Sequence, residues 1–287
     1  MIRLWGADNN LETIVALSRP YGLESDLSML AVREALRNCM TANQPEVPRP
    51  NGELVFTTAN GEYQPLLGIF NTESRLDDTP YHLDRGLDAT VGKAKLDRVR
   101  EGVETLRAVD PLAGSFFDLA MFVVFWSPSE SATGGTTSQA LGVLWVDQPS
   151  SWAERDYSEF LVHELSHTLL FLAEWRFGLY SSPEAMTDPS NYAASAIRQT
   201  MRPLDKSLHS IIVGAEVLLA REQVLGHTEE YGLHPGSTEL RDGVSQSIES
   251  VAEVASRSEV LTPFALDLLE RARAVTESLS VTSHAAA

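Results

Sequence analysis

The most constraining feature of this chain is the five-residue pattern His163-Glu164-Leu165-Ser166-His167 within a hydrophobic stretch. Histidines at positions i and i+4 of a helix point from one face, so they can bind one metal ion together. The flanking runs 160–162 and 169–172 make the predicted helix hydrophobic on nearly every side, which favours a buried helix. Two histidines and a glutamate in such a helix need polar partners. The sequence therefore predicts a metal site, with a pair of hydrogen-bonded core histidines as the alternative.

The length and composition describe an ordinary soluble globular protein. A chain of 287 residues can form one large or two modest domains. Its formal net charge of −18 argues against a nucleic-acid or anionic-membrane partner. Cys39 is the only cysteine, so intramolecular disulfides are excluded. We find no apolar stretch typical of a signal peptide or a membrane span, and we expect a cytoplasmic protein.

Hydrophobic periodicity outlines the order of the elements. It predicts strands near 54–56, 119–126 and 140–146, and helices over 24–40, 87–109, 204–226, 238–256 and 262–278. The segment Ser151-Trp152-Ala153-Glu154 has the form of a capping box and predicts the start of the helix that carries the histidines. We expect an α+β, zincin-like fold with a small, mostly antiparallel sheet packed on that helix and a helical C-terminal half.

We expect two regions along the chain. Residues 1–110 form a mixed region that is either a separate peptide-docking unit or part of the same core. Residues 111–287 form the metal-binding catalytic domain. The strand at 140–147 precedes the metal-binding helix directly, so it is a candidate edge for an extended peptide.

A catalytic metal usually has a third protein ligand. The downstream candidates are Glu174, Asp188, Asp205, His209, Glu216 and His227. His209 is the strongest, because it lies on the next predicted helix, 42 residues after His167. Glu216 follows His209 by seven residues on the same helix face, so it either replaces His209 as ligand or orients it.

Two further residues have predicted roles beside the metal. Glu164 would be the general base of a zinc hydrolase, or it would orient a ligand or the substrate in an iron oxygenase. Arg202 ordinarily would be an ion-paired residue at a helix start. Beside a metal, its guanidinium is suited to hold the carboxylate of a 2-oxoacid cosubstrate.

Residues 140–225 resemble the H-E-x-x-H proteins of bacterial peptide natural-product clusters, which are iron(II)/2-oxoglutarate-dependent peptide β-hydroxylases. The matching segments are Leu161-Val162-His163-Glu164-Leu165-Ser166-His167-Thr168, Tyr180-Ser181-Ser182-Pro183, Arg202-Pro203-Leu204 and Leu208-His209. The chain departs from the family pattern at Met201, where Asp-Pro would precede the arginine, and at Ser210, which replaces a glycine. The resemblance implies His163, His167 and His209 as iron ligands and a peptide substrate, with or without a leader segment.

Three functions remain open. The first is the iron(II)/2-oxoglutarate oxygenase, which we favour because the Arg202…His209 segment has no evident use in a peptidase. The second is a zinc metallopeptidase of the gluzincin-like type. The H-E-x-x-H motif, taken alone, is typical of such peptidases. The metzincin type is excluded, since no His-x-x-Gly-x-x-His extension follows His167. The third is a binding protein with a structural metal, for which cysteine ligands would be expected.

Overall fold

The computed structural model describes residues 1–72, 82–85, 88–130, 132–227 and 232–279. Within these residues the chain divides into two compact units. The helical unit contains Met1–Asn10 and the described residues from Ala173 onward, and the sheet unit contains the described residues between Leu11 and Leu172. The sequence placed a division at residue 110, whereas the units separate after Leu172, inside a continuous helix.

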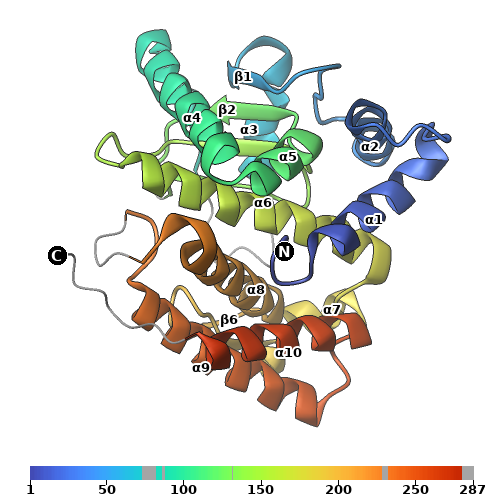
Figure 1. Cartoon of the computed structure of the whole chain (residues 1–287), viewed down its shortest axis with the longest axis vertical. Helices are drawn as coiled ribbons and strands as arrows, with labels where there is room; N and C mark the ends of the chain where they lie inside the picture. Colours follow the sequence, from blue (N-terminus) through green and yellow to red (C-terminus); the bar gives the residue numbers. More distant parts are fainter. Residues whose placement is uncertain (73–81, 86–87, 131, 228–231, 280–287) are drawn as a thin grey trace. The chain divides into compact units, whose positions relative to one another are not determined.

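The sheet unit is built on four strands (Figure 1). They are β1 (Val55–Thr58), β2 (Val123–Trp126), β3 (Gly134–Gly135) and β4 (Val143–Val146), in the order β1-β2-β4-β3. The first three in that order are parallel, and only β3 is antiparallel to its neighbour. Strands β2 and β4 are buried along their whole length, which explains their unbroken runs of large hydrophobic residues. The expectation of a mostly antiparallel sheet is therefore wrong.

Several helices belong to the sheet unit, and some of them begin at capping residues that the periodicity alone did not locate. They are α2 (Met29–Asn43), α3 (Pro65–Phe70), α4 (Ala89–Val109) and α5 (Pro111–Ala120), with α1 (Ala7–Ser18) crossing the division between units. Ser28 accepts from the Ala31 N–H, so α2 starts five residues later than predicted. Helix α4 packs on β1 and β2, where Gly92 lies against the Trp126 ring.

The metal-motif helix is α6 (Glu154–Phe177), which is continuous across the division between the units. The helix starts at Glu154, two residues later than a cap at Ser151 would place it. The Asp156 carboxylate accepts from the Ala153 N–H at 2.9 Å, which is the return half of such a box, whereas Ser151 lies outside the helix. Phe160 of α6 packs against β3, because a Cβ built on Gly134 would lie 2.5 Å from its ring. The Gly134-Gly135 pair is thus an edge strand packed on α6.

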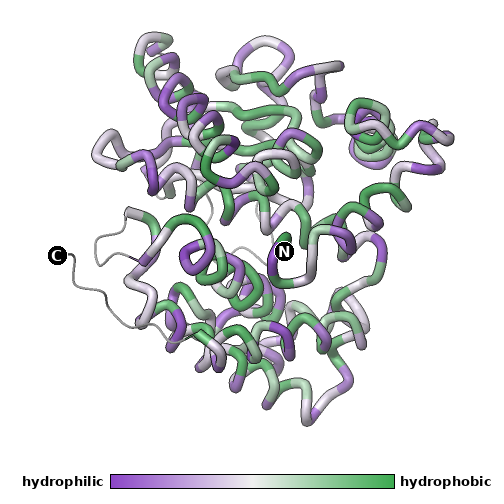
Figure 2. The backbone as a smooth tube through the Cα atoms, in the orientation of Figure 1, coloured by the Kyte–Doolittle hydropathy of each residue, from purple (hydrophilic) through white to green (hydrophobic). Residues whose placement is uncertain are grey.

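The helical unit is formed by three long helices and short connecting elements. The long ones are α8 (Leu204–Ala220), α9 (Ser237–Arg257) and α10 (Pro263–Ser278), close to their predicted bounds; the short ones are α7 (Pro183–Thr187), β5 (Ala193–Ala194) and β6 (Met201–Arg202). Helix α8 contacts both α9 and α10, and it is buried almost throughout. Figure 2 shows the strands of the sheet unit and α8 as mainly hydrophobic segments. The N-terminal segment joins this unit through Trp5, which packs edge-on against Phe177 and Phe264.

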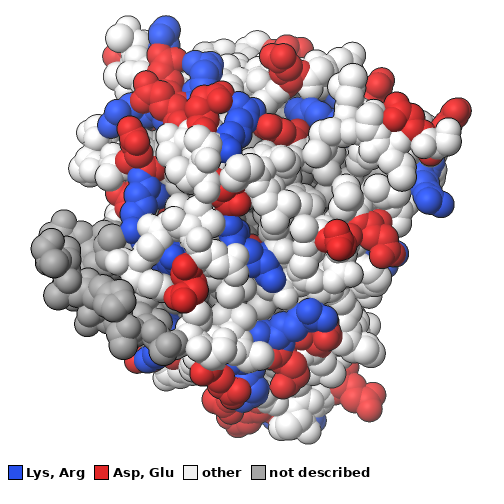
Figure 3. Space-filling view, in the orientation of Figure 1, with Lys and Arg blue, Asp and Glu red and all other residues white. Residues whose placement is uncertain are grey.

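The coarse predictions of fold class are confirmed: the chain is α+β, with a small sheet and a helical C-terminal part. On the face drawn in Figure 3, acidic and basic side chains are interspersed. The excess of acidic residues therefore does not form one continuous patch there. Among the described helices, none combines the length and the hydrophobicity needed to cross a membrane.

Candidate metal centre

The histidine pair occupies the one partly accessible strip of the middle of α6. From Tyr157 to Ala173 every residue of the helix is buried except His163 and His167. Their imidazole rings meet edge-on, with the two Nε2 atoms 3.2 Å apart. Because the rest of this segment faces hydrophobic core, the helix exposes only the two side chains that the sequence identified as ligands.

The spacing of the two nitrogens fits a shared metal ion. Two nitrogens bonded to one ion at about 2.1 Å lie about 3.0 Å apart at a right angle and about 3.4 Å apart at the tetrahedral angle. The observed 3.2 Å falls between these limits. The pair therefore has the geometry to hold an ion with little movement of either ring.

Glu164 lies beside the pair and is fixed from the sheet. Its Oε2 accepts a hydrogen bond of 2.9 Å from the Thr136 hydroxyl, and its Oε1 lies 3.8 Å from His163 Nε2. Burial raises the pKa of Glu164 to about 7, although the hydrogen bonds from Thr136 favour the charged form. A carboxyl group in this position can accept or donate a proton near neutral pH.

The other predicted site residues belong to the helical unit. His209 is buried on α8, where its Nε2 lies 3.5 Å from Asp205 Oδ1, one turn earlier in the helix. Burial lowers the pKa of His209, which keeps its imidazole neutral and suited to metal binding. Arg202 is half-buried in β6, directly before the Pro203 that begins α8.

Glu216 has different partners from those that the sequence suggested. Its carboxylate accepts hydrogen bonds from the backbone N–H groups of Arg3 and Leu4, both at 2.9 Å, and forms an ion pair with the Met1 amino group at 2.6 Å. These contacts tie the N-terminal segment to α8. They do not support Glu216 as the alternative metal ligand, and the neighbour of His209 is Asp205 instead.

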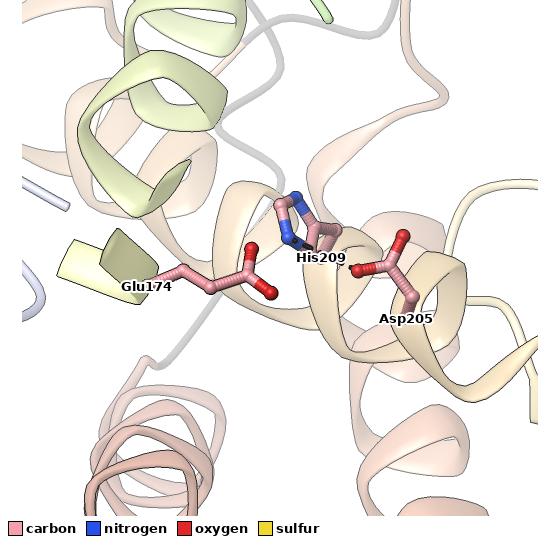
Figure 4. Close-up of side chains that lie close together, drawn as sticks. All are labelled: Glu174, Asp205 and His209. Carbon is pink, nitrogen blue, oxygen red and sulfur yellow. Dashed lines mark ion pairs between the residues drawn. The ribbon is translucent and has the colours of Figure 1, made fainter. Parts of the chain in front are cut away.

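The structure adds two residues around His209 that sequence reasoning had left among the weaker candidates. Glu174, Asp205 and His209 bring one potential ligand atom each within 4.8 Å of the others (Figure 4). Tyr180 donates a hydrogen bond of 3.2 Å to Asp205 Oδ1. Burial, and secondly the charge of Asp205, raise the pKa of Glu174 to about 7. The spacing of Asp205 and His209 by four residues was visible in the sequence, whereas the approach of Glu174 depends on tertiary structure.

The strand expected to bind a peptide is not a free edge. Strand β4 is paired with β2 on one side and with β3 on the other, and β3 is the edge of the sheet. Ser166, within the motif, donates its hydroxyl hydrogen to the Val162 carbonyl at 2.7 Å. This hydrogen bond satisfies the Ser166 hydroxyl within its own helix.

Comparison with known proteins adds no family to these observations. No protein-family model matches the sequence, and no curated protein matches it significantly.

Proposed function

We propose that this chain is a metal-dependent enzyme in which His163 and His167 hold the metal ion. We propose further that it hydroxylates the β-carbon of a side chain in a ribosomal peptide, using iron(II), 2-oxoglutarate and O2 in the cytoplasm. The observation that carries the proposal is the 3.2 Å approach of the two Nε2 atoms at the only residues between Tyr157 and Ala173 of α6 that are not buried. In this reaction O2 would be the oxidant: bound iron would allow one oxygen atom to enter the C–H bond and the other to enter 2-oxoglutarate, which would be decarboxylated to succinate and CO2.

Each remaining residue then has a defined task. Glu164 orients a metal ligand or the substrate, because the hydroxyl of Thr136, the residue after β3, fixes its carboxylate. Arg202 offers a guanidinium for the remote carboxylate of the 2-oxoacid, a role that we infer from its charge and its position in the sequence. His209 is the third ligand predicted from the sequence. The packing of α6 against β3 supports the finer description of the fold as zincin-like.

The test is spectroscopic and needs no peptide. Metal-free protein is mixed anaerobically with iron(II) and then with 2-oxoglutarate. A weak visible charge-transfer band that requires both components shows a 2-oxoacid chelated on iron. If iron binds but the band does not form, the oxygenase proposal is contradicted. In the Arg202→Lys variant, 2-oxoglutarate should bind more weakly while the affinity for iron stays the same.

A zinc metallopeptidase is the second candidate, and the buried, hydrogen-bonded position of Glu164 favours it specifically. In a peptidase this carboxylate accepts the proton of the attacking water. Glu164→Gln therefore abolishes peptide hydrolysis, whereas an oxygenase keeps partial turnover. Tight retention of zinc by the purified protein, without the charge-transfer band, would decide for the peptidase.

A further inference from the structure

The helical unit contains a second group of metal-ligating side chains. Asp205 and His209 lie one turn apart on α8, and Glu174 reaches toward them from the C-terminal end of α6 (Figure 4). Asp205 is 5% exposed and His209 is 3% exposed, so neither is an ordinary surface group. The distance of 3.5 Å between His209 Nε2 and Asp205 Oδ1 is already near the spacing of two donors around one ion.

The charges of this group favour a cation. Two carboxylates meet there, and one ammonium group, that of Lys206, lies 3.8 Å from Asp205 Oδ2. Carboxylates buried close together are costly unless a proton or a cation balances them. Tyr180 donates to Asp205 Oδ1 and so restrains the carboxylate in the way that outer partners restrain metal ligands.

We propose that Glu174, Asp205 and His209 bind a divalent transition-metal ion within the helical unit. One imidazole and two carboxylates suit manganese(II), iron(II) or zinc(II). The three donor atoms lie within 4.8 Å of one another, so each side chain moves inward by about 1 Å to reach bonding distance. The inference requires neither His163 nor His167, but it replaces the role of His209 as third ligand of the proposed iron site, because one imidazole nitrogen binds one ion. It assigns His209 to partners on its own unit.

Manganese(II) titration of the full chain tests this site. The protein is the His163→Ala/His167→Ala double variant, stripped with a chelator and titrated at high salt, which screens diffuse binding to an acidic protein. Loss of the electron paramagnetic resonance signal of free manganese(II) reports uptake. We expect uptake of about one ion per chain, weakened at least about tenfold by adding Asp205→Asn or Glu174→Gln. Asp242→Asn is the matched control, since that exposed carboxylate of α9 pairs with neighbouring Arg241.

Two results would overturn the inference. One is the absence of saturable manganese(II) uptake in the double variant. That result would mean that protons alone balance the charges of Glu174 and Asp205. The other is uptake that neither added substitution weakens. Glu174→Gln keeps the test decisive if Asp205→Asn does not fold, because Glu174 is only half-buried. The proposed function fails on a separate measurement, the missing iron–2-oxoglutarate band in the wild-type protein.

Discussion

Thr136 donates its hydroxyl hydrogen to Glu164 at 2.9 Å, which links the edge of the sheet to the glutamate of the metal motif. The donor directly follows β3, and β3 itself packs on Phe160 of the same helix. The short edge strand thus does two things: it covers α6, and it fixes a carboxyl group whose pKa burial raises to about 7. A substitution in this segment should therefore change the chemistry of Glu164 without altering a proposed metal ligand.

Thr136→Val removes the hydroxyl donor while conserving side-chain shape. The hydrogen bond favours the charged carboxylate, so its loss should raise the pKa of Glu164 further above its ordinary value. Infrared titration of the carboxyl band in metal-free protein measures the change. Thr137→Val is the control, because the Thr137 hydroxyl accepts from the Gln139 N–H instead of contacting Glu164. An unchanged titration in Thr136→Val would mean that the hydrogen bond does not influence Glu164.

His163→Ala and His167→Ala should each remove the metal held by the pair. Loss of one of two facing nitrogens breaks the chelate, and we expect iron(II) affinity at this site to fall by more than about 100-fold. Anaerobic iron(II) titration, followed through the band formed with 2-oxoglutarate, measures that site specifically. His227→Ala is the matched histidine control, since its ring pairs with Glu222 at 2.8 Å. Unchanged affinity in either motif variant would contradict the ligand assignment.

Local patterns predicted the helices well and the sheet poorly, for a physical reason. The periodicity of a helix depends only on the residues of that helix. The sequence therefore located α9 and α10 to within a residue or two at each end. Strand direction depends on which segments pair, and no local pattern records that Val123 lies beside Val143 in a parallel register. Helix α5 was missed because its last residues, Leu119 and Ala120, continue without a break into the hydrophobic run of β2.

The same distinction applies to the candidate site. The i,i+4 spacing alone predicted the approach of His163 and His167, because one helix determines it. Glu216 was given a role beside His209, yet its partners lie more than 200 residues earlier, at Arg3 and Leu4. Contacts between residues so far apart in the sequence depend on how α8 packs in the core, and a local sequence pattern does not predict them.

Gly134→Ala should destabilise the sheet unit through overpacking. A Cβ at this position would lie 2.5 Å from the Phe160 ring and 2.9 Å from the Trp145 carbonyl oxygen, and both groups are held in the core. We expect a loss of about 1–3 kcal/mol in the free energy of unfolding, measured by chemical denaturation. Gly68→Ala is the control within the same unit, because that helical glycine has nothing within 4 Å of an added Cβ. Equal stability of the two variants would show that β3 yields to the added methyl group.

Glu216→Gln should be the most damaging of these substitutions. It leaves the buried Met1 amino group without its 2.6 Å counter-charge, and breaking a buried ion pair costs about 3–5 kcal/mol. Chemical denaturation at neutral pH measures the loss. Glu222→Gln, on an exposed side chain of the same unit, should change the free energy of unfolding by less than about 0.5 kcal/mol. A similar loss in the free energy of unfolding in both variants would contradict a stabilising ion pair between Glu216 and the Met1 amino group.

The pH dependence of this difference follows from the carboxylate. Burial alone would raise the pKa of Glu216, but the Met1 amine and the N–H of Arg3 together lower it below its ordinary 4.5. Burial also lowers the pKa of the Met1 amine, against the attraction of Glu216. Below pH 4.5 the change in stability comes from protonation of the Glu216 carboxylate, because the backbone N–H of Arg3 that donates to it does not titrate. A lowered folded-state pKa stabilises the protein above pH 4.5, and that stabilisation is lost as the pH falls through the folded-state value. The stability gap between wild type and Glu216→Gln should therefore narrow below pH 4.5, and a gap that stays constant into acid would contradict the ion pair.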